Sequence, residues 1–191
     1  MKRIMIDPGH GGGDPGAINK NLNVSEKTIN LMYATKIYNY LKENYVVEPY
    51  LTRNSDVALT LKDRVDKSNR LMVDRFISIH CNSYSNDEAN GMEIWVYDKN
   101  TNENFANDII TQMNKNVKLK SRGVKENKQF YVTRYTKCKA CLIELGFISN
   151  INDSKYIQDN IDLYVKTICE GIANNMKLQE KENKCNCECH K

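Results

Sequence analysis

Two short, almost uninterrupted apolar segments constrain the fold of this chain more than any other feature of its sequence. Residues 76–79 read Phe-Ile-Ser-Ile, and residues 140–145 read Ala-Cys-Leu-Ile-Glu-Leu. Such runs are typical of strands that are covered on both faces, as in parallel sheets. Segments with helical spacing of apolar residues lie between the apolar runs, and strands that alternate with helices predict an α/β fold with a largely parallel sheet.

The expected elements follow from the period of the apolar residues and from the positions of Gly, Pro and Asn. We predict strands at residues 2–7, 46–52, 75–81, 92–97 and 140–145, and a short strand at 130–135. We predict helices at residues 24–44, 61–72, 104–117, 154–158 and 161–176, the first of them capped by Asn23.

Length, charge and composition fit one globular domain. The chain has 191 residues, of which 40% are hydrophobic, and a chain of this size buries about 70% of its unfolded surface without needing disulfides. The formal net charge is only +4 and no dense block of Lys and Arg occurs, so nucleic acid is not an expected partner. Residues 1–178 are expected to form the domain, and residues 179–191 a charged, Cys-rich tail.

The first residues do not read as an export signal, because Met1-Lys2-Arg3-Ile4 leads directly into the first predicted strand. No segment approaches the roughly 18 apolar residues of a membrane span, so membrane insertion is not expected. The seven cysteines are odd in number and irregular in spacing, which favours reduced thiols over a disulfide framework.

Both histidines of the expected domain fall where sites form in α/β sheets. His10 follows the first predicted strand within Asp7-Pro-Gly-His-Gly-Gly12, and His80 lies at the end of the third. Sites in open sheets form beyond the carboxyl ends of strands, and histidine is the commonest metal ligand. The glycines do not form a phosphate loop, because Gly-Lys-Ser/Thr is absent. A plain turn at His10 and a hydrogen-bonded core histidine at His80 stay open as alternatives.

Two glutamates are further candidates. Glu26 lies in the first turn of the first predicted helix, and Asn23-Val-Ser-Glu26 reads as a capping box, so the sequence favours a capping role over metal binding. Glu144 interrupts an apolar strand on the same face as Leu142. A carboxylate is costly there unless it is paired, and an apolar setting raises the pKa of a glutamate toward the range useful for proton transfer.

These four residues match the requirements of a hydrolytic zinc site. Two histidines and one carboxylate are a known ligand set of catalytic zinc, with a fourth position left for water. Zinc lowers the pKa of that water and polarises a carbonyl, while a further glutamate moves the proton. His10, Glu26, His80 and Glu144 can fill these roles, although their spacing is not a local motif.

Several motifs then resemble one family, in the same order along residues 1–177. They are Ile6-Asp-Pro-Gly-His-Gly-Gly12 with Asp14-Pro-Gly-Ala17 and Glu26; Thr52-Arg53 with Asp56, Leu61, Arg64 and Asn69; Ser78-Ile-His-Cys-Asn82; and Leu142-Ile-Glu-Leu-Gly-Phe-Ile-Ser-Asn150. They resemble the zinc-dependent N-acetylmuramoyl-L-alanine amidases of bacterial autolysins, sporulation enzymes and phage endolysins. The resemblance implies Zn²⁺ ligands at His10, Glu26 and His80, and a catalytic glutamate at Glu144.

The same resemblance implies a fold and an activity. The fold would be a single α/β domain with a mostly parallel, twisted sheet of about six strands flanked by helices on both faces. The activity would be hydrolysis of the amide bond between N-acetylmuramic acid and L-alanine in peptidoglycan. Separately from the resemblance, we expect a monomer. Cys81 departs from the alanine common in the family, and strand alternation turns it to the face opposite His80.

Alternatives to this function are a wall-binding module without activity and a metalloenzyme that cuts another amide, such as a peptide cross-link. The missing export signal favours synthesis in the cytoplasm and release to the wall by holin-type lysis, as for a phage endolysin, over a host autolysin. Cys185, Cys187, Cys189 and His190 look like a metal-binding tract in composition. Their Cys-x-Cys spacing differs from that of structural zinc sites, so a metal-binding or redox role, a flexible tail and a truncated wall-binding module all stay open.

Overall fold

Six strands form one sheet in the order β4-β1-β5-β8-β6-β7 in the computed structural model, which describes residues 1–182. They are β1 (Arg3–Pro8), β4 (Glu48–Leu51), β5 (Arg75–Asn82), β6 (Met92–Val96), β7 (Ser121–Glu126) and β8 (Lys139–Phe147). The first four strands of this order run parallel, and β6 and β7, parallel to each other, run antiparallel to them. The predicted α/β fold with a mostly parallel sheet of about six strands is confirmed.

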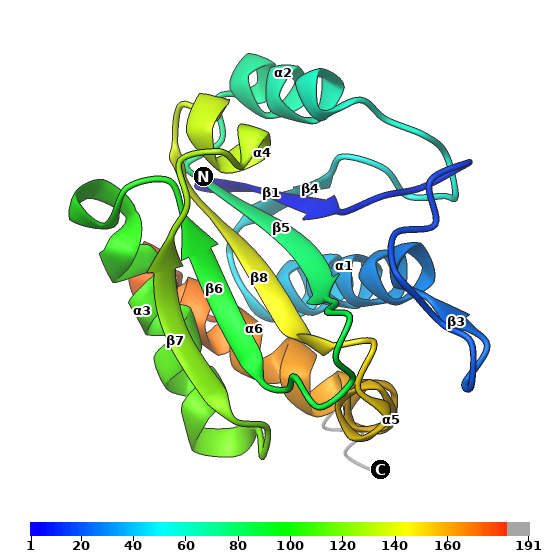
Figure 1. Ribbon diagram of the computed structural model, residues 1–191. Helices are drawn as coiled ribbons and strands as arrows, with labels where there is room; N and C mark the ends of the chain where they lie inside the picture. The colour runs from blue at the N-terminus through cyan, green and yellow to red at the C-terminus, as the bar shows by residue number, and fades with distance from the viewer. Residues whose placement is uncertain (183–191) are drawn as a thin grey trace, which may run out of the picture.

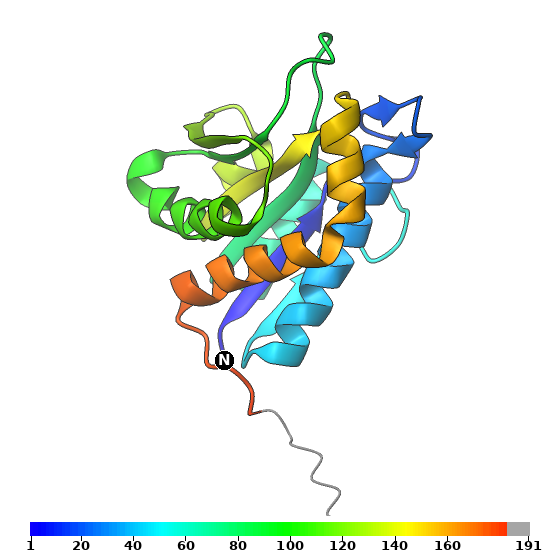
Figure 2. The ribbon, with the colours of Figure 1, turned by 90° about the horizontal axis from the view of Figure 1, so that it is seen from below.

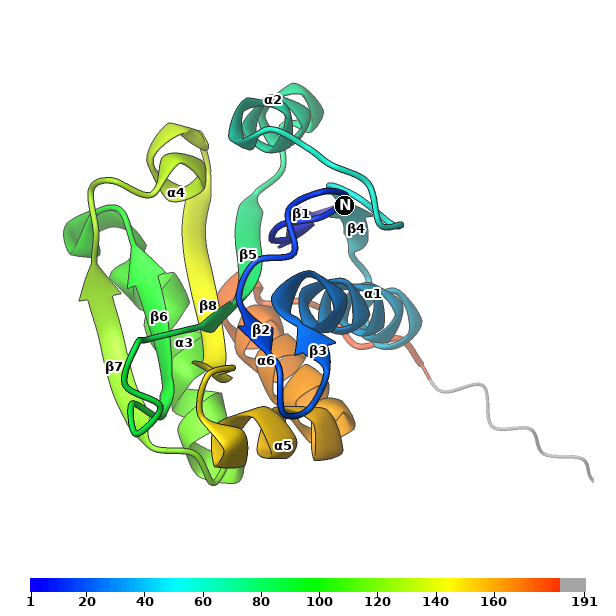
Figure 3. The same ribbon diagram turned by 45° about the vertical axis from the view of Figure 1, so that its right-hand side comes forward.

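Helices cover both faces of the sheet, as predicted (Figures 1 and 3). The helices α1 (Glu26–Asn44), α3 (Lys99–Asn116), α5 (Ile151–Asp159) and α6 (Ile161–Met176) lie on one face, and α2 (Leu61–Leu71) and α4 (Tyr131–Tyr135) lie on the other. Figure 2 shows α6 running beside α1 and α3, both of which it contacts. Within residues 1–182, none of the helices has the length and apolar composition needed to cross a bilayer.

Strand alternation divides the buried side chains between two cores. Ile77 and Ile79 belong to the larger core, with α1, α3 and α6, whereas Phe76 and Leu142 belong to the smaller core, with α2 and α4. Glu144 follows Leu142 by two residues in β8, so it projects from the same face as the smaller core. The less densely covered face of the sheet therefore carries this acid.

One predicted strand is wrong, and one edge strand was not predicted. A strand was predicted at residues 130–135, but Tyr131–Tyr135 form the short helix α4, with Phe130 as its N-cap. This short helix packs Val132 into the smaller core. The edge strand β7 was not predicted, because its sequence is polar and its residues are exposed or half-buried.

Three helix boundaries differ from the predicted ones because local pairing and capping decide them. The helix α1 begins at Glu26, since residues 24–25 form β3 (Val24–Ser25), which pairs with β2 (Ile18–Asn19). The helix α3 begins five residues before the predicted start, where Asp98 accepts a hydrogen bond from the backbone of Asn100. Asn150 caps α5 in the same way, so that this helix begins at Ile151.

The chain still contacts the domain beyond residue 178. Backbone hydrogen bonds join Val46 to Gln179 and Lys181 to Asn44. The domain boundary expected at residue 178 stays a prediction. The candidate metal-binding tract of Cys185, Cys187, Cys189 and His190 lies outside the described residues.

Candidate active site

Three of the four predicted site residues meet at the carboxyl edge of the sheet. His10 follows β1, His80 lies near the end of β5, and Glu26 begins α1. Nε2 of His10 and Nδ1 of His80 lie 3.1 and 3.0 Å from Oε1 of Glu26, and one ligand atom of each residue lies within 4.8 Å of the other two. Atoms bound about 2.0–2.1 Å from a tetrahedral zinc ion are roughly 3.3 Å apart. The donor set and its spacing therefore fit one metal ion.

The predicted capping role of Glu26 is wrong. Ser25 is the N-cap of α1, no side chain caps the helix there, and Asn23 lies outside it. The carboxylate of Glu26 turns inward, where its oxygens accept hydrogen bonds from the backbone N–H of Ala17 at 3.0 Å and of Cys81 at 3.1 Å. Backbone donors thus hold the carboxylate in place against the two imidazoles.

Mutual hydrogen bonding shifts the pKa values of His10 and Glu26 in opposite directions. The hydrogen bond to Glu26 raises the pKa of His10 to about 8, against the opposing effect of burial. Burial alone would raise the pKa of Glu26, but the hydrogen bonds with His10 and His80 outweigh it and hold that pKa far below its ordinary value. The metal-free site is therefore built around an ionised carboxylate.

Asp14 supports His10 from the outer side, and the sequence analysis did not assign it a role. Its Oδ2 lies 2.8 Å from Nδ1 of His10, and this hydrogen bond lowers the pKa of Asp14. In the metal-free site Nε2–H of His10 donates to Glu26, and an N–H held at Nδ1 by Asp14 leaves the lone pair of Nε2 available when a metal ion replaces that proton. Metal-binding histidines generally have such an outer partner, and the His-x₃-Asp spacing in the loop was the available signal.

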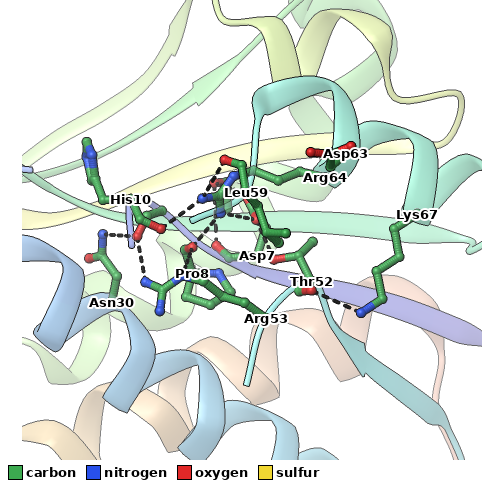
Figure 4. Close-up of polar contacts among 12 residues, drawn as sticks. Asp7, Pro8, His10, Asn30, Thr52, Arg53, Leu59, Asp63, Arg64 and Lys67 are labelled. Carbon is green, nitrogen blue, oxygen red and sulfur yellow. Dashed lines mark hydrogen bonds and ion pairs between the residues drawn. The ribbon is translucent and has the colours of Figure 1, made fainter. Parts of the chain in front are cut away.

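Two buried arginines fix the backbone of the loop that carries His10 (Figure 4). Arg64 donates from Nη1 to the carbonyl of Pro8 at 2.6 Å and from Nη2 to the carbonyl of His10 at 2.8 Å. Arg53 donates from Nη2 to the carbonyl of Gly9 at 2.8 Å. His10 itself has a φ of 59°, a left-handed conformation that is strained for a non-glycine residue, and the arginine contacts hold the loop in it.

Two glycines allow the imidazoles and the carboxylate to approach the loop. A Cβ at Gly9 would overlap the ring of His80, and a Cβ at Gly16 would lie 2.6 Å from Oε2 of Glu26. Gly16 also has a φ of 63°. Glycine is therefore required at both positions for the three ligand atoms to meet.

Glu144 lies beside this cluster, as the register partner of His80 in the neighbouring strand. Its Oε2 is buried and has no hydrogen-bond partner among residues 1–182. Burial, with a contribution from the charges of Glu26 and Glu93, raises the pKa of Glu144 well above its ordinary value. The raised pKa expected from the apolar strand is confirmed, and an unpartnered buried carboxyl is suited to taking up and releasing a proton.

A cavity of about 590 Å³ connects the predicted residues, and His10, His80, Leu142 and Glu144 are among those that line it. A larger cavity of about 810 Å³ lies around β4 and α1, and none of the four site residues lines it. Cys81 points away from the smaller cavity, with its Sγ 3.9 Å from Oδ1 of Asn30, as strand alternation predicted. The smaller cavity is therefore the candidate active site.

An α/β domain with two imidazoles and a carboxylate around one point, beside a buried acid, defines a metal-binding hydrolase class. Comparison with known proteins identifies the family within that class. The sequence profile described as N-acetylmuramoyl-L-alanine amidase matches residues 4–174. The chain belongs to the N-acetylmuramoyl-L-alanine amidase family, and its activity is that of a peptidoglycan amidase. The predicted family and enzyme class are confirmed.

Relatives and solved structures support this placement over nearly the whole described chain. The chain is 38% identical to the uncharacterized protein YqiI of Bacillus subtilis (strain 168), over 91% of this chain and 82% of YqiI. It is 34% identical to N-acetylmuramoyl-L-alanine amidase LytC of the same organism, over 89% of this chain but only 34% of LytC. The catalytic domain of CwlV, an N-acetylmuramoyl-L-alanine amidase from Bacillus (Paenibacillus) polymyxa var. colistinus, superimposes with a TM-score of 0.89 at 33% identity, covering 94% of this chain and 100% of that domain.

Proposed function

We propose that this protein is a zinc-dependent hydrolase of the amide bond between N-acetylmuramic acid and L-alanine in peptidoglycan. The observation that carries the proposal is the convergence of ligand atoms from His10, Glu26 and His80 on one point beside Glu144, whose Oε2 has no hydrogen-bond partner in the described part of the chain. The names of LytC and CwlV as N-acetylmuramoyl-L-alanine amidases support the choice of bond.

His10, Glu26 and His80 would hold the ion, since two imidazoles and one carboxylate leave a fourth position open. When bound, zinc supplies a Lewis acid that activates water and polarises the scissile carbonyl. Asp14 fixes the tautomer of His10, and Arg53 and Arg64 hold the loop backbone. The protein thereby keeps the ligands in place before substrate arrives.

Glu144 acts first as general base and then as general acid. It takes a proton from the attacking water as the new C–O bond forms, and it returns that proton to the nitrogen as the C–N bond breaks. Burial raises the pKa of Glu144 above its ordinary value, which makes its carboxylate a stronger proton acceptor from water than an exposed glutamate. The products are a free lactyl carboxylate and a peptide that begins with L-alanine.

The biological setting is also part of the proposal. Release by holin-type lysis as a phage endolysin stays a prediction from the sequence, and YqiI and LytC are proteins of a bacterium. The purified protein is added to intact cells with and without a membrane-permeabilising agent, and lysis is measured. This comparison distinguishes action from outside the wall from action after release through the membrane. The predicted monomer is checked by light scattering.

Metal removal followed by product mapping tests the proposed reaction. Treatment with a chelator is expected to abolish digestion of purified peptidoglycan, and one equivalent of zinc is expected to restore it. The digest should contain new amino-terminal L-alanine and no new reducing sugar ends. Full activity of the metal-free protein, or new amino termini other than L-alanine, would contradict the proposal.

A further inference from the structure

A second buried carboxylate lies next to Glu144 on the same face of the sheet. Glu93 of β6 is the register partner of Glu144 in β8, and its side chain is 2% exposed. Oε2 of Glu93 accepts hydrogen bonds from Nε of Arg122 at 2.7 Å and from Nζ of Lys125 at 2.6 Å. Burial raises the pKa of Glu93, but Lys125 and Arg122 outweigh it and hold that pKa below its ordinary value.

The three side chains of this cluster, Glu93, Arg122 and Lys125, carry a net charge of +1, because two cations share one carboxylate. The side chains of Arg122 and Lys125 are 33% and 32% exposed. A cation that is fixed by a buried partner and still open to solvent attracts an anionic ligand without a large desolvation cost.

A continuous strip of side chains joins the cluster to the active-site cavity. Register pairs across neighbouring strands are His80 with Glu144, Glu144 with Glu93, Leu142 with Trp95, and Trp95 with Lys125. Phe130, which lines the cavity, packs edge-to-face on Trp95 with ring centres 5.8 Å apart. Nζ of Lys125 lies 5.1 Å from the ring centre of Trp95. An apolar floor therefore leads from the cavity to the two cations.

The width of this strip corresponds to a short peptide. Glu144 in β8 and the cations in β7 are two strand spacings apart, which is about 10 Å because neighbouring strands are about 4.8 Å apart. An extended peptide advances about 3.3–3.6 Å per residue, so the strip spans about three residues. In the proposed function Glu144 protonates the departing amine, and the peptide side of the substrate therefore lies on this side of the scissile bond.

We propose that Arg122 and Lys125 bind a carboxylate of the peptide stem, about three residues beyond the scissile amide. This inference rests on the proposed function. The contact makes the protein selective for stems that carry a free carboxylate at that distance. Charge-assisted hydrogen bonds from Arg and Lys are well suited to this contact. Glu93 then holds the two cations in place without neutralising both.

Two synthetic N-acetylmuramoyl tripeptides test the inference, one ending in a free carboxylate and the other in a carboxamide. The unchanged, zinc-loaded protein should prefer the carboxylate by about five- to tenfold in kcat/KM, mainly through KM. Lys125→Met leaves Arg122 and Glu93 as a neutral pair, so the preference should fall below about twofold. Lys125→Arg should keep it. Lys36→Met is the matched control, because Lys36 pairs with Asp162 on the opposite face of the sheet and its loss should leave the preference unchanged.

The comparison of the two substrates separates binding from folding, because a merely structural role of Lys125 would slow both tripeptides equally. On the unchanged protein, the preference should also shrink as salt rises, a test that needs no variant. Equal cleavage of the two substrates, or a preference that Lys125→Met or salt does not reduce, overturns the inference and leaves the proposed function intact. Absence of new amino-terminal L-alanine from both substrates overturns the proposed function.

Discussion

Glu144 and Glu93 are register partners on adjacent strands, yet their surroundings give them opposite properties. Glu93 is held by two cations, which keep its pKa low. Glu144 has one oxygen without a partner among the described residues, and burial raises its pKa. Desolvation acts to raise the pKa of both groups, so the cationic partners decide whether such a glutamate is a fixed charge or a proton carrier.

The neighbouring strands explain this difference. β7 lies at the sheet edge beside β6, and its polar sequence supplies Arg122 and Lys125 to Glu93. Glu144 lies in β8 between β5 and β6, where the neighbouring residues in register are His80 and Glu93 itself. Substitutions at these two positions should therefore separate loss of activity from loss of stability.

Replacement of Glu144 by Gln is expected to lower kcat by about 10²–10⁴-fold, because the variant loses general acid–base catalysis. Bound zinc should stay at the level of the unchanged protein, since Glu144 is not one of the three converging ligands. Steady-state kinetics on an N-acetylmuramoyl peptide, with metal analysis of the same sample, measure both quantities. A kcat within tenfold of the unchanged protein would remove Glu144 from the mechanism.

Replacement of Glu93 by Gln is expected to have the converse effect. The variant loses the carboxylate shared by Arg122 and Lys125, at a cost of about 1–3 kcal/mol in the free energy of unfolding, a range kept low because both cations are partly exposed. Turnover should fall less than tenfold. Urea unfolding gives the stability change as a shift in midpoint at constant slope. A variant as stable as the unchanged protein but inactive would reverse the roles assigned to the two glutamates.

Acidification should remove the stability that the Glu93 carboxylate contributes. The pKa of Glu93 is lower in the folded state than in the unfolded chain, so its contribution to stability is present above the unfolded pKa of about 4.3 and is lost as pH falls through the folded value. The stability difference between the unchanged protein and Glu93→Gln should therefore shrink below about pH 4. Urea unfolding at a series of pH values measures it, and a difference that is constant down to pH 3 or grows there would contradict the ion pairing.

The smallest expected effect is that of Glu144→Gln on the stability of the metal-free protein. A buried carboxyl with a raised pKa opposes folding when it is ionised, so a neutral amide of similar size should leave the free energy of unfolding unchanged or raise it by at most about 1 kcal/mol. Denaturation at neutral pH provides the check. A loss of more than about 2 kcal/mol would indicate that the Glu144 carboxylate has a stabilising partner.

The sequence predicted the parts of the site that depend on strand ends. His10 follows one predicted strand and His80 ends another, and Glu144 stands out as an acid within a strongly apolar strand. The orientation of Glu26 was not predictable from its neighbours, because the capping pattern is local and the pairing of β3 with β2 overrides it. The family resemblance, and not the helix signal, pointed to Glu26 as a ligand.

The contacts made by Arg64 and Arg122 could not be predicted from the sequence, for a different physical reason. Arg64 contacts the carbonyl of Pro8 across 56 residues of sequence, and Arg122 contacts Glu93 across 29 residues. No local pattern encodes such contacts. The strand β7 was not predicted for a related reason: an exposed edge strand needs no apolar alternation, so its sequence carries no strand signal.

Anomalous scattering from crystals of the zinc-loaded protein shows directly which residues hold the ion. We expect one zinc peak at about 2.0–2.2 Å from Nε2 of His10, Nδ1 of His80 and Oε1 of Glu26, with Glu144 beside the ion and not bound to it. A protein that binds no zinc there, or that binds it through other residues, would contradict the proposed metal site.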